Sequence, residues 1–168
     1  MKHLSEIVDA ARARGRKRLA VAYGQDAHTI EAVYDAYKDG IVEATLFGDQ
    51  AVIEKTCAEL NIDSSLFTIV NEPNAAKAVA AAVKAVVSNE ADVLMKGLVS
   101  TDVYMRGILN KEAGLFPPKG VLSHISVFEW AGYHKLLLAS DIAVLPLPDL
   151  KQKQALIKYI AQVAKTLE

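Results

Sequence analysis

The most informative stretch of the sequence is Asp92-Val93-Leu94-Met95-Lys96-Gly97-Leu98-Val99-Ser100-Thr101-Asp102-Val103-Tyr104-Met105-Arg106. Its first residues form a short apolar run, which is typical of a central strand in a parallel sheet. Gly97 then permits a tight turn, and Ser100 can cap a helix that begins near Thr101 by accepting a backbone hydrogen bond. The stretch therefore predicts a buried strand, a glycine loop and a helix in immediate succession.

A strand, a glycine loop and a helix in this order form a site for an anion. The free N–H groups and the positive end of the helix dipole attract phosphate or carboxylate, and Lys96 and Arg106 bring two positive charges to the same region. The spacing differs from that of a P-loop and from the three-glycine dinucleotide fingerprint. A purely structural explanation stays open, in which Lys96 is solvated, Ser100 is only a cap, and the stem of Arg106 covers apolar side chains.

The composition indicates a folded protein. The chain has 168 residues, of which 52% are hydrophobic and 23% are charged, and this is ample for one core. The net charge of -1 argues against a general nucleic-acid binder, which needs a strongly basic face. No apolar run approaches the roughly 20 residues of a membrane span, and the N-terminus lacks the apolar core of a secretory signal. We therefore expect a cytoplasmic protein that binds neither nucleic acid nor membranes.

Strand-like and helix-like segments alternate over the first part of the chain. Four apolar runs are each followed by a segment with helical periodicity, and they lie at residues 19–23, 44–47, 67–70 and 93–95. An earlier helix over residues 5–14 is expected to end at Gly15. Strands that are apolar on both faces and separated by helices fit a parallel sheet covered on two sides. We therefore predict a three-layer α/β/α fold with a mostly parallel sheet.

The pattern changes after Asn110. Glycines and prolines over residues 114–120 predict a loop, and residues 121–129 and 135–139 then predict the two strands of an added β-hairpin. Apolar residues recur at helical spacing over 156–167, so the chain is expected to end in an amphipathic helix.

This organisation suggests two parts. We predict an α/β domain over residues 1–148 and a carboxy-terminal helix over 149–168 that leads toward a further domain. The single cysteine, Cys57, lies among apolar residues on a predicted helix. We therefore expect it to be a small buried core residue and not a redox-active or nucleophilic one.

Ligands of open α/β sheets bind beyond the carboxyl ends of the strands, which share one rim. Several polar residues follow predicted strands here, and Asp26, Asp49 and Asn74 are each well placed to cap a helix. Lys96 has no such capping role. It is therefore the strongest candidate for a ligand-binding residue on this rim.

Several segments together resemble one enzyme family, and they include Met95-Lys96-Gly97-Leu98-Val99-Ser100-Thr101, Leu109-Asn110-Lys111-Glu112-Ala113-Gly114-Leu115, Leu122-Ser123-His124-Ile125-Ser126 and Ser140-Asp141-Ile142-Ala143. The chain closely resembles the phosphate acetyl- and butyryltransferases, and most of all the butyryltransferases. The resemblance implies an isocitrate/isopropylmalate-dehydrogenase-like fold of two α/β domains with the active site between them. It also implies the reaction of acyl-CoA with phosphate to give acyl phosphate and CoA. CoA is then a substrate, and we expect no metal and no permanently bound cofactor.

The resemblance also implies roles for individual residues. Phosphate or acyl phosphate would be bound by Lys96, Gly97, Ser100, Thr101 and Arg106. Further candidates for the substrate cleft are Ser123, His124 and Asp141. For His124 a purely structural role stays open. Asp141 is expected either to orient Lys96 or Arg106, or to cap a turn.

Members of this family are considerably longer, and the segments that carry the aspartate thought to act on the CoA thiol have no match in this sequence. We therefore expect no catalytic residue in this chain, which would supply the phosphate-side half of the cleft and have little activity alone. Two other functions stay open, namely a noncatalytic module that binds an anion or CoA, and a structural half that needs a partner chain. The expected partners are small-molecule substrates, and a homo-oligomer is left open.

Overall fold

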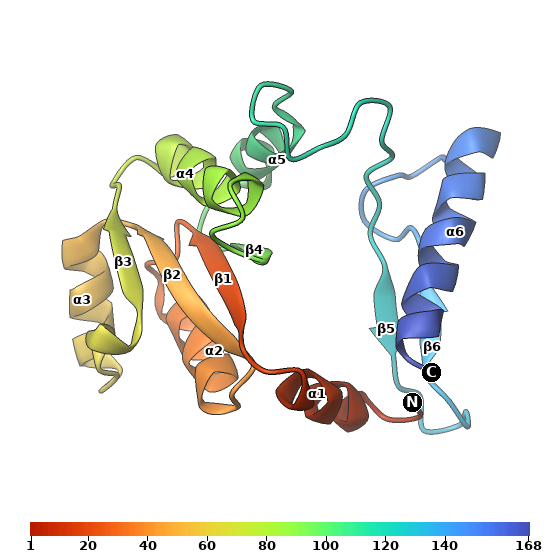
Figure 1. Cartoon of the computed structure of the whole chain (residues 1–168), viewed down its shortest axis with the longest axis horizontal. Helices are drawn as coiled ribbons and strands as arrows, with labels where there is room; N and C mark the ends of the chain where they lie inside the picture. The colour runs from red at the N-terminus through yellow and green to blue at the C-terminus, as the bar shows by residue number, and fades with distance from the viewer. The chain divides into compact units, whose positions relative to one another are not determined.

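A computed structural model describes residues 1–168, which form six α-helices, one short 3₁₀ helix and six strands (Figure 1). The contacts of the chain divide it into two compact units. One unit comprises Arg14–Pro118, and the other comprises Met1–Ala13 together with Lys119–Glu168. The division into a domain over 1–148 and a helix over 149–168 stays a prediction.

The Arg14–Pro118 unit is built around a parallel sheet of four strands in the order β3-β2-β1-β4. The strands are β1 (Lys17–Ala22), β2 (Val42–Gly48), β3 (Thr68–Asn71) and β4 (Val93–Lys96). All four lie where the sequence predicts them. The chain moves outward from β1 to β3 and then crosses back to β4, so the order of the strands reverses between β1 and β4.

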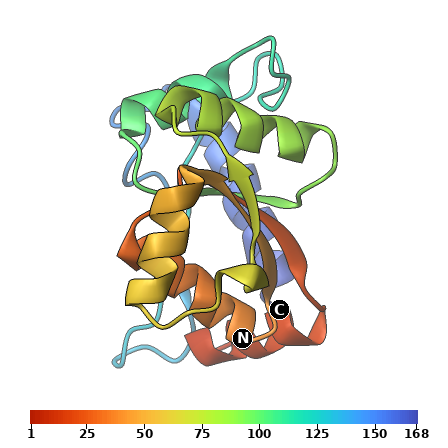
Figure 2. The ribbon, with the colours of Figure 1, turned by 90° about the vertical axis from the view of Figure 1, so that its left-hand side faces the viewer.

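Helices cover both faces of this sheet (Figure 1, Figure 2). One face is covered by α2 (Ala27–Lys38) and α3 (Gln50–Glu59), and the short 3₁₀ helix (Ser64–Leu66) follows α3. The other face is covered by α4 (Ala75–Val87), and α5 (Thr101–Leu109) packs against α4. The predicted three-layer arrangement is therefore confirmed. No helix of the chain is both long enough and apolar enough to span a membrane.

Each face of the sheet contributes to a separate part of the core. Val21 and Leu46 point toward α2 and α3, where Ile30, Ile53 and Cys57 are fully buried. The alternate residues of β1 face α4, so small alanines on both elements allow close packing. Cys57 has no exposed surface, as the sequence predicts, and burial raises the pKa of its thiol.

Polar side chains cap the helices of this unit as the sequence predicts. Asp26 caps α2, Asp49 caps α3, Asn74 caps α4 and Ser100 caps α5, each by accepting hydrogen bonds from backbone N–H groups of the first turn. These bonds satisfy donors that have no partner within the helix. The capping residues in the sequence therefore predicted correctly where these four helices begin.

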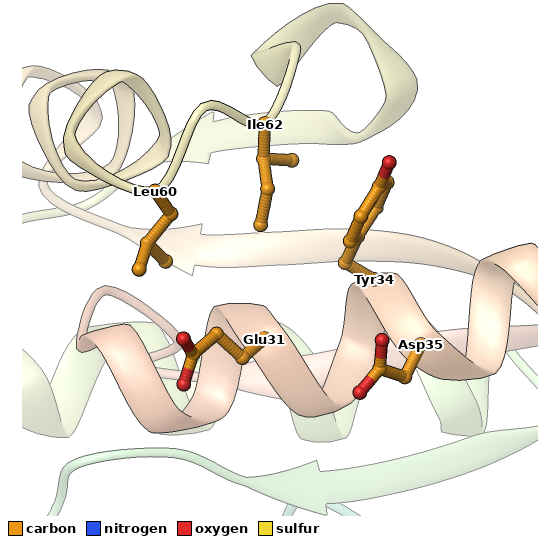
Figure 3. A pocket seen from close by; sticks show the side chains of 5 residues that line it. All are labelled: Glu31, Tyr34, Asp35, Leu60 and Ile62. Atoms are coloured by element: carbon orange, nitrogen blue, oxygen red, sulfur yellow. The ribbon is translucent and has the colours of Figure 1, made fainter.

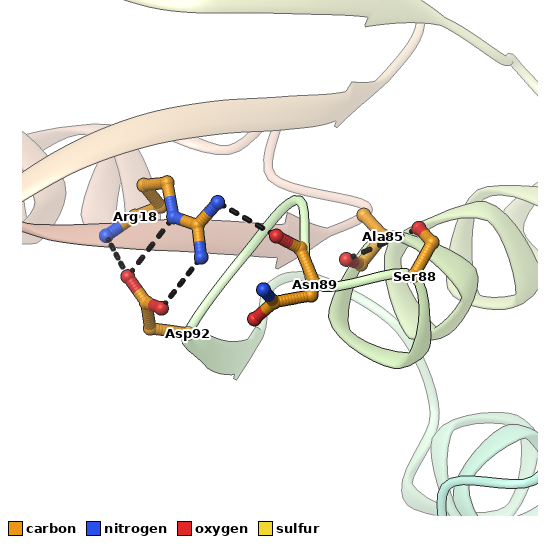
Figure 4. A network of polar contacts seen from close by, with 5 residues as sticks. All are labelled: Arg18, Ala85, Ser88, Asn89 and Asp92. Atoms are coloured by element: carbon orange, nitrogen blue, oxygen red, sulfur yellow. Dashed lines mark hydrogen bonds and ion pairs between the residues drawn. The ribbon is translucent and has the colours of Figure 1, made fainter.

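An ion pair fixes the amino-terminal ends of β1 and β4 relative to each other (Figure 4). Arg18 Nη2 lies 2.7 Å from Asp92 Oδ1, and its guanidinium also donates to the carbonyl of Asn89 at 2.7 Å. The hydrogen bonds from the side chain and backbone N–H of Arg18 hold the pKa of the Asp92 carboxyl well below its usual range. Nearby, Arg16 lies over the ring of Tyr37 at 4.3 Å. Arg16 and Arg18 thus both have partners within the fold.

The second unit contains α1 (Leu4–Ala13), β5 (Ser126–Phe128), β6 (Leu137–Ala139) and α6 (Leu150–Thr166). The antiparallel pairing of β5 with β6 confirms the predicted hairpin, but the paired strands are much shorter than 121–129 and 135–139. The residues before Ser126 make other bonds, since the N–H of His124 donates to the Asp141 side chain instead of to a strand. The predicted final helix is also present and begins with a capping box.

Candidate functional site

The predicted phosphate-binding residues lie at the switch point of the parallel sheet, between β1 and β4. Lys96 ends β4 and pairs in register with Ala22, the last residue of β1. Gly97 follows in the loop, and Ser100 and Thr101 begin α5. In open α/β sheets the crevice for a ligand lies beyond the strand ends at such a point. The topology therefore supports the position that the sequence indicates.

Gly97 packs directly against the chain that leaves β1. Its N–H donates to the carbonyl of Ala22 at 2.9 Å, and the N–H of Leu98 donates to the carbonyl of Tyr23 at 3.0 Å. A Cβ atom at position 97 would lie 2.4 Å from the Tyr23 oxygen and 2.9 Å from the Cα of Gly24. The backbone of Gly97 is not left-handed. A glycine is thus required here for close approach and not for an unusual φ.

The first turn of α5 combines features that attract and repel an anion. Ser100 Oγ accepts a hydrogen bond from the N–H of Val103 at 3.3 Å, so its capping role is confirmed. The positive end of the helix dipole favours negative charge in this region. However, Asp102 places a carboxylate in the same turn, which opposes a bound anion. Thr101 is exposed at the helix start.

Lys96 supplies a cation with no carboxylate partner. Its Nζ lies 3.4 Å from the carbonyl oxygen of Gly97, so the side chain curves over the loop. Within the same unit Arg18, Lys38 and Lys55 differ from Lys96, because each of them is paired with a carboxylate. The charge of Lys96 is therefore available to a ligand at the switch point.

Arg106 is engaged on its own helix. Its Nη2 lies 2.6 Å from Asp102 Oδ2, and its Nε donates to Oδ1 at 3.1 Å. The spacing of four residues places the two side chains next to each other on a helix, a signal that the assignment of Arg106 to phosphate overlooked. Both side chains are largely exposed, 77% for Arg106 and 63% for Asp102. If another anion replaced Asp102 beside Arg106, the lost ion pair would cost only about 0.2 to 1 kcal/mol.

Asp141, in the second unit, organises a turn. Its carboxylate accepts hydrogen bonds from the N–H groups of Ala143 and Val144 at 2.8 Å and of His124 at 3.0 Å. Burial alone would raise the pKa of this carboxyl, but these bonds and one from Leu145 outweigh it and hold the pKa well below its usual range. Of the two roles predicted for Asp141, the structure shows the capping of a turn.

Ser123 and His124 lie beside this turn and are partly buried. Ser123 Oγ is 3.0 Å from Ser140 Oγ, a partner that the sequence did not reveal, and His124 Nδ1 is 3.4 Å from Ser126 Oγ. The latter distance exceeds the range of about 2.6 to 3.2 Å typical of a serine activated by a histidine.

A hollow of about 270 Å³ on the α2–α3 side lies elsewhere in the Arg14–Pro118 unit (Figure 3). It is lined by Glu31, Tyr34, Asp35, Leu60 and Ile62. Its carboxylates repel anions, and Asp35 is already paired with Lys38 at 2.8 Å. No group of three or more histidine, cysteine, aspartate or glutamate side chains in the chain could hold a metal ion. The loop after β4 is therefore a better candidate for an anion site than this hollow.

Comparisons of sequence find that this chain is similar to proteins that are named as acyltransferases. The family described as phosphate acetyl/butaryl transferase matches residues 3–80. The phosphate butyryltransferase of Clostridium acetobutylicum is 40% identical over 167 residues, which are 99% of this chain and 55% of that protein. The phosphate acetyltransferase of Thermotoga maritima is 35% identical over 164 residues, 98% of this chain and 55% of the relative. The chain thus spans about half the length of the curated relatives it matches.

Solved structures show the same fold at lower sequence identity. A branched-chain phosphotransacylase from Enterococcus faecalis superposes with a TM-score of 0.71 at 20% identity, over 90% of this chain and 51% of that one. The EutD phosphotransacetylase from Staphylococcus aureus also gives 0.71, at 13% identity, over 90% of this chain and 54% of that one. The predicted fold class is therefore confirmed, while its description as isocitrate/isopropylmalate-dehydrogenase-like stays a prediction.

Proposed function

The chain belongs to the phosphate acetyl/butyryltransferase family, and from this premise we propose that it forms the phosphate-binding half of a phosphate acyltransferase. The reaction is acyl-CoA plus phosphate to acyl phosphate plus CoA, with CoA as a substrate and the cytoplasm as the location. One observation carries the proposal: Lys96, a cation without a carboxylate partner, ends β4 at the switch point of the sheet, where such folds bind ligands.

Each residue of the loop has a distinct part in binding phosphate under this proposal. Lys96 supplies the positive charge, and Gly97 lets the loop pack closely against the end of β1. The hydroxyls of Ser100 and Thr101 lie at the start of α5, whose dipole adds to the attraction. Arg106 joins the site by exchanging Asp102 for phosphate, because a guanidinium can hold two oxygens at once.

The chemistry explains why a positively charged site is useful. A phosphate oxygen attacks the thioester carbonyl, and the C–O bond forms as the carbonyl oxygen becomes an oxyanion. Collapse of this tetrahedral intermediate breaks the C–S bond and releases CoA as a thiolate, which then takes up a proton. Fixed positive groups stabilise the developing negative charge, and bound phosphate is held for attack. We assign no catalytic acid to this chain.

Ser123, His124 and Asp141 take a supporting role in this proposal. The turn at Asp141 fixes the backbone of His124 through a hydrogen bond of 3.0 Å. The hydroxyl of Ser123 lies 3.0 Å from that of Ser140, so this side chain also has a partner within the unit. We assign Ser123 and His124 to the lining of the substrate cleft in a complete enzyme, with Asp141 as the residue that positions them.

A thiol-release assay with butyryl-CoA and phosphate tests the proposal. The chain is assayed alone and after mixing with the part of the Clostridium acetobutylicum relative that it does not span. We expect no turnover above the enzyme-free rate for the chain alone, turnover for the mixture, and a lower rate when the mixture contains Lys96→Ala. Phosphate binding without turnover in the mixture would favour a noncatalytic module. Turnover that does not depend on Lys96 would favour a purely structural half.

A further inference from the structure

The loop that carries Lys96 also presents an apolar side chain to solvent. Leu98 is 64% exposed, the highest value for any large apolar side chain of the Arg14–Pro118 unit. Its neighbour Val99 is 8% exposed and packs in the core beneath α4. Adjacent residues of one short loop are therefore directed to opposite environments.

The outward orientation of Leu98 is imposed by the backbone on both sides of it. Its own N–H is bonded to the carbonyl of Tyr23 at 3.0 Å, and the N–H of Val99 donates to the carbonyl of Gly97 at 2.9 Å. Gly97 is wedged against the end of β1, and Val99 is buried. Leu98 therefore cannot turn into the core without breaking these contacts.

Lys96 and Leu98 together form an amphiphilic pair at the switch point. The Nζ of Lys96 lies 3.4 Å from the carbonyl of Gly97, the residue between them, so the cation folds back over the loop that carries the leucine. Two residues of extended chain span at most about 7 Å. A bare phosphate ion has no apolar group that could contact the leucine. A ligand that carries a hydrocarbon group close to its negative charge can use both side chains.

We propose that Leu98 contacts the acyl chain of the substrate and favours butyryl-sized over acetyl-sized acyl groups. This inference rests on the proposed function. In an acyl phosphate, only the bridging oxygen and the carbonyl carbon separate the hydrocarbon from phosphorus, which matches the short separation of the pair. Complete burial of a methylene raises affinity about fourfold. Contact with one face of a leucine buries a methylene only in part, so we expect affinity to rise about twofold for each methylene.

Alkylphosphonates test this inference on the chain alone, because they join an alkyl group directly to a phosphate-like anion. Calorimetric titrations compare inorganic phosphate, methylphosphonate and n-propylphosphonate. For the wild type we expect n-propylphosphonate to bind about fourfold more tightly than methylphosphonate, since it has two more methylenes. Leu98→Ala should reduce this ratio to about one, whereas Leu98→Met should retain it. Leu109→Ala, which removes an apolar side chain that is 44% exposed at the far end of α5, should leave the ratio unchanged.

The outcomes separate the two proposals. If phosphate binding is intact and depends on Lys96, but the ratio is one in the wild type or survives Leu98→Ala, the acyl-chain contact is wrong and the proposed function stands. If Leu98→Ala weakens all three anions equally, the side chain shapes the loop, and the acyl-chain contact is again wrong. If neither phosphate nor a phosphonate binds in a Lys96-dependent way, the proposed function fails together with the inference. Thermal unfolding of each variant excludes loss of the fold as the cause.

Discussion

Gly97 and Tyr23 meet through their backbones at the carboxyl ends of β4 and β1. A Cβ atom on Gly97 would lie 2.4 Å from the carbonyl oxygen of Tyr23, and that oxygen accepts the N–H of Leu98 at 3.0 Å. This contact fixes the loop after β4 against the end of β1. The position of Lys96 therefore depends on the absence of a side chain at the next residue.

Gly97→Ala should destabilise the Arg14–Pro118 unit by about 1 to 3 kcal/mol, because the added methyl group must displace rigid backbone. The entropy that alanine removes from the unfolded chain offsets only part of this loss. Urea unfolding measures the difference. Gly132→Ala is the control, because its Cβ would meet nothing closer than 3.7 Å and should change stability by less than about 0.5 kcal/mol. A Gly97→Ala variant as stable as the wild type would show that the loop can move aside.

Lys96→Ala should weaken phosphate binding about fivefold at low ionic strength, as expected for losing about 1 kcal/mol between two charges near water. Asp102→Asn should strengthen binding, since it removes a negative charge from the first turn of α5 and releases Arg106. Arg106→Ala should then cost more in the Asp102→Asn background than in the wild type. Calorimetry with phosphate measures the wild type, the three single variants and the Asp102→Asn/Arg106→Ala double variant, with Lys55→Ala on α3 as a control for lost charge. Equal affinity of Lys96→Ala and wild type would remove Lys96 from the site.

Ser100→Ala should cost about 1 kcal/mol of stability, because the N–H of Val103 loses its capping acceptor. Ser100→Asp should restore most of this stability, since aspartate caps equally well and favours the dipole. The same substitution should weaken phosphate binding by adding a negative charge. Chemical denaturation and phosphate titration of both variants separate the two effects. Full stability of Ser100→Ala would contradict a contribution from the cap.

The Arg18–Asp92 pair should make stability depend on acidic pH. The pKa of Asp92 is lowered in the folded chain, so its contribution is complete above the unfolded value of about 4 and is lost as the pH falls toward the folded value. The stability difference between wild type and Asp92→Asn should therefore be constant near pH 6 and shrink below about pH 4. Urea unfolding between these conditions measures it. A difference that stays constant down to pH 3 would show that the carboxylate does not titrate with a lowered pKa.

Cys57 should react with thiol reagents only when the core opens. The residue has no exposed surface, and burial raises the pKa of its thiol, so both access and thiolate formation are suppressed. We expect Cys57 to be labelled slowly in native buffer. As urea is added, its labelling rate should rise steeply and follow the unfolding transition. Val52→Cys on the exposed face of α3 provides the comparison, because Val52 is 38% exposed and should be labelled at once. Rapid labelling of Cys57 in native buffer would show local opening around α3.

The sequence predicted those parts of the fold that depend on neighbouring residues. The caps at Asp26 and Asn74 were readable because a cap and its helix are adjacent in sequence. The contact of Gly97 with Tyr23 was not, because it joins residues brought together only by the strand order. The pairing of Arg106 with Asp102 shows a different limit of prediction from sequence. An arginine that can bind phosphate can also pair with a carboxylate four positions away on the same helix, and the sequence alone does not decide between the two. The phosphate-binding assignments therefore stay predictions, even though the switch-point topology supports them.

The central position of β1 has a consequence for how this protein is made. Its strand pairs on one side with β2, which follows soon after, but on the other side with β4, so that Leu19 meets Val93. The chain is synthesised at about 5 to 20 residues per second, so β4 leaves the ribosome roughly 4 to 15 seconds after β1. Throughout this interval the apolar residues 19–22 of β1 have one unpaired edge that is open to other chains. The nascent chain is then at its most vulnerable to aggregation, and chaperone capture would matter most before Lys96 emerges.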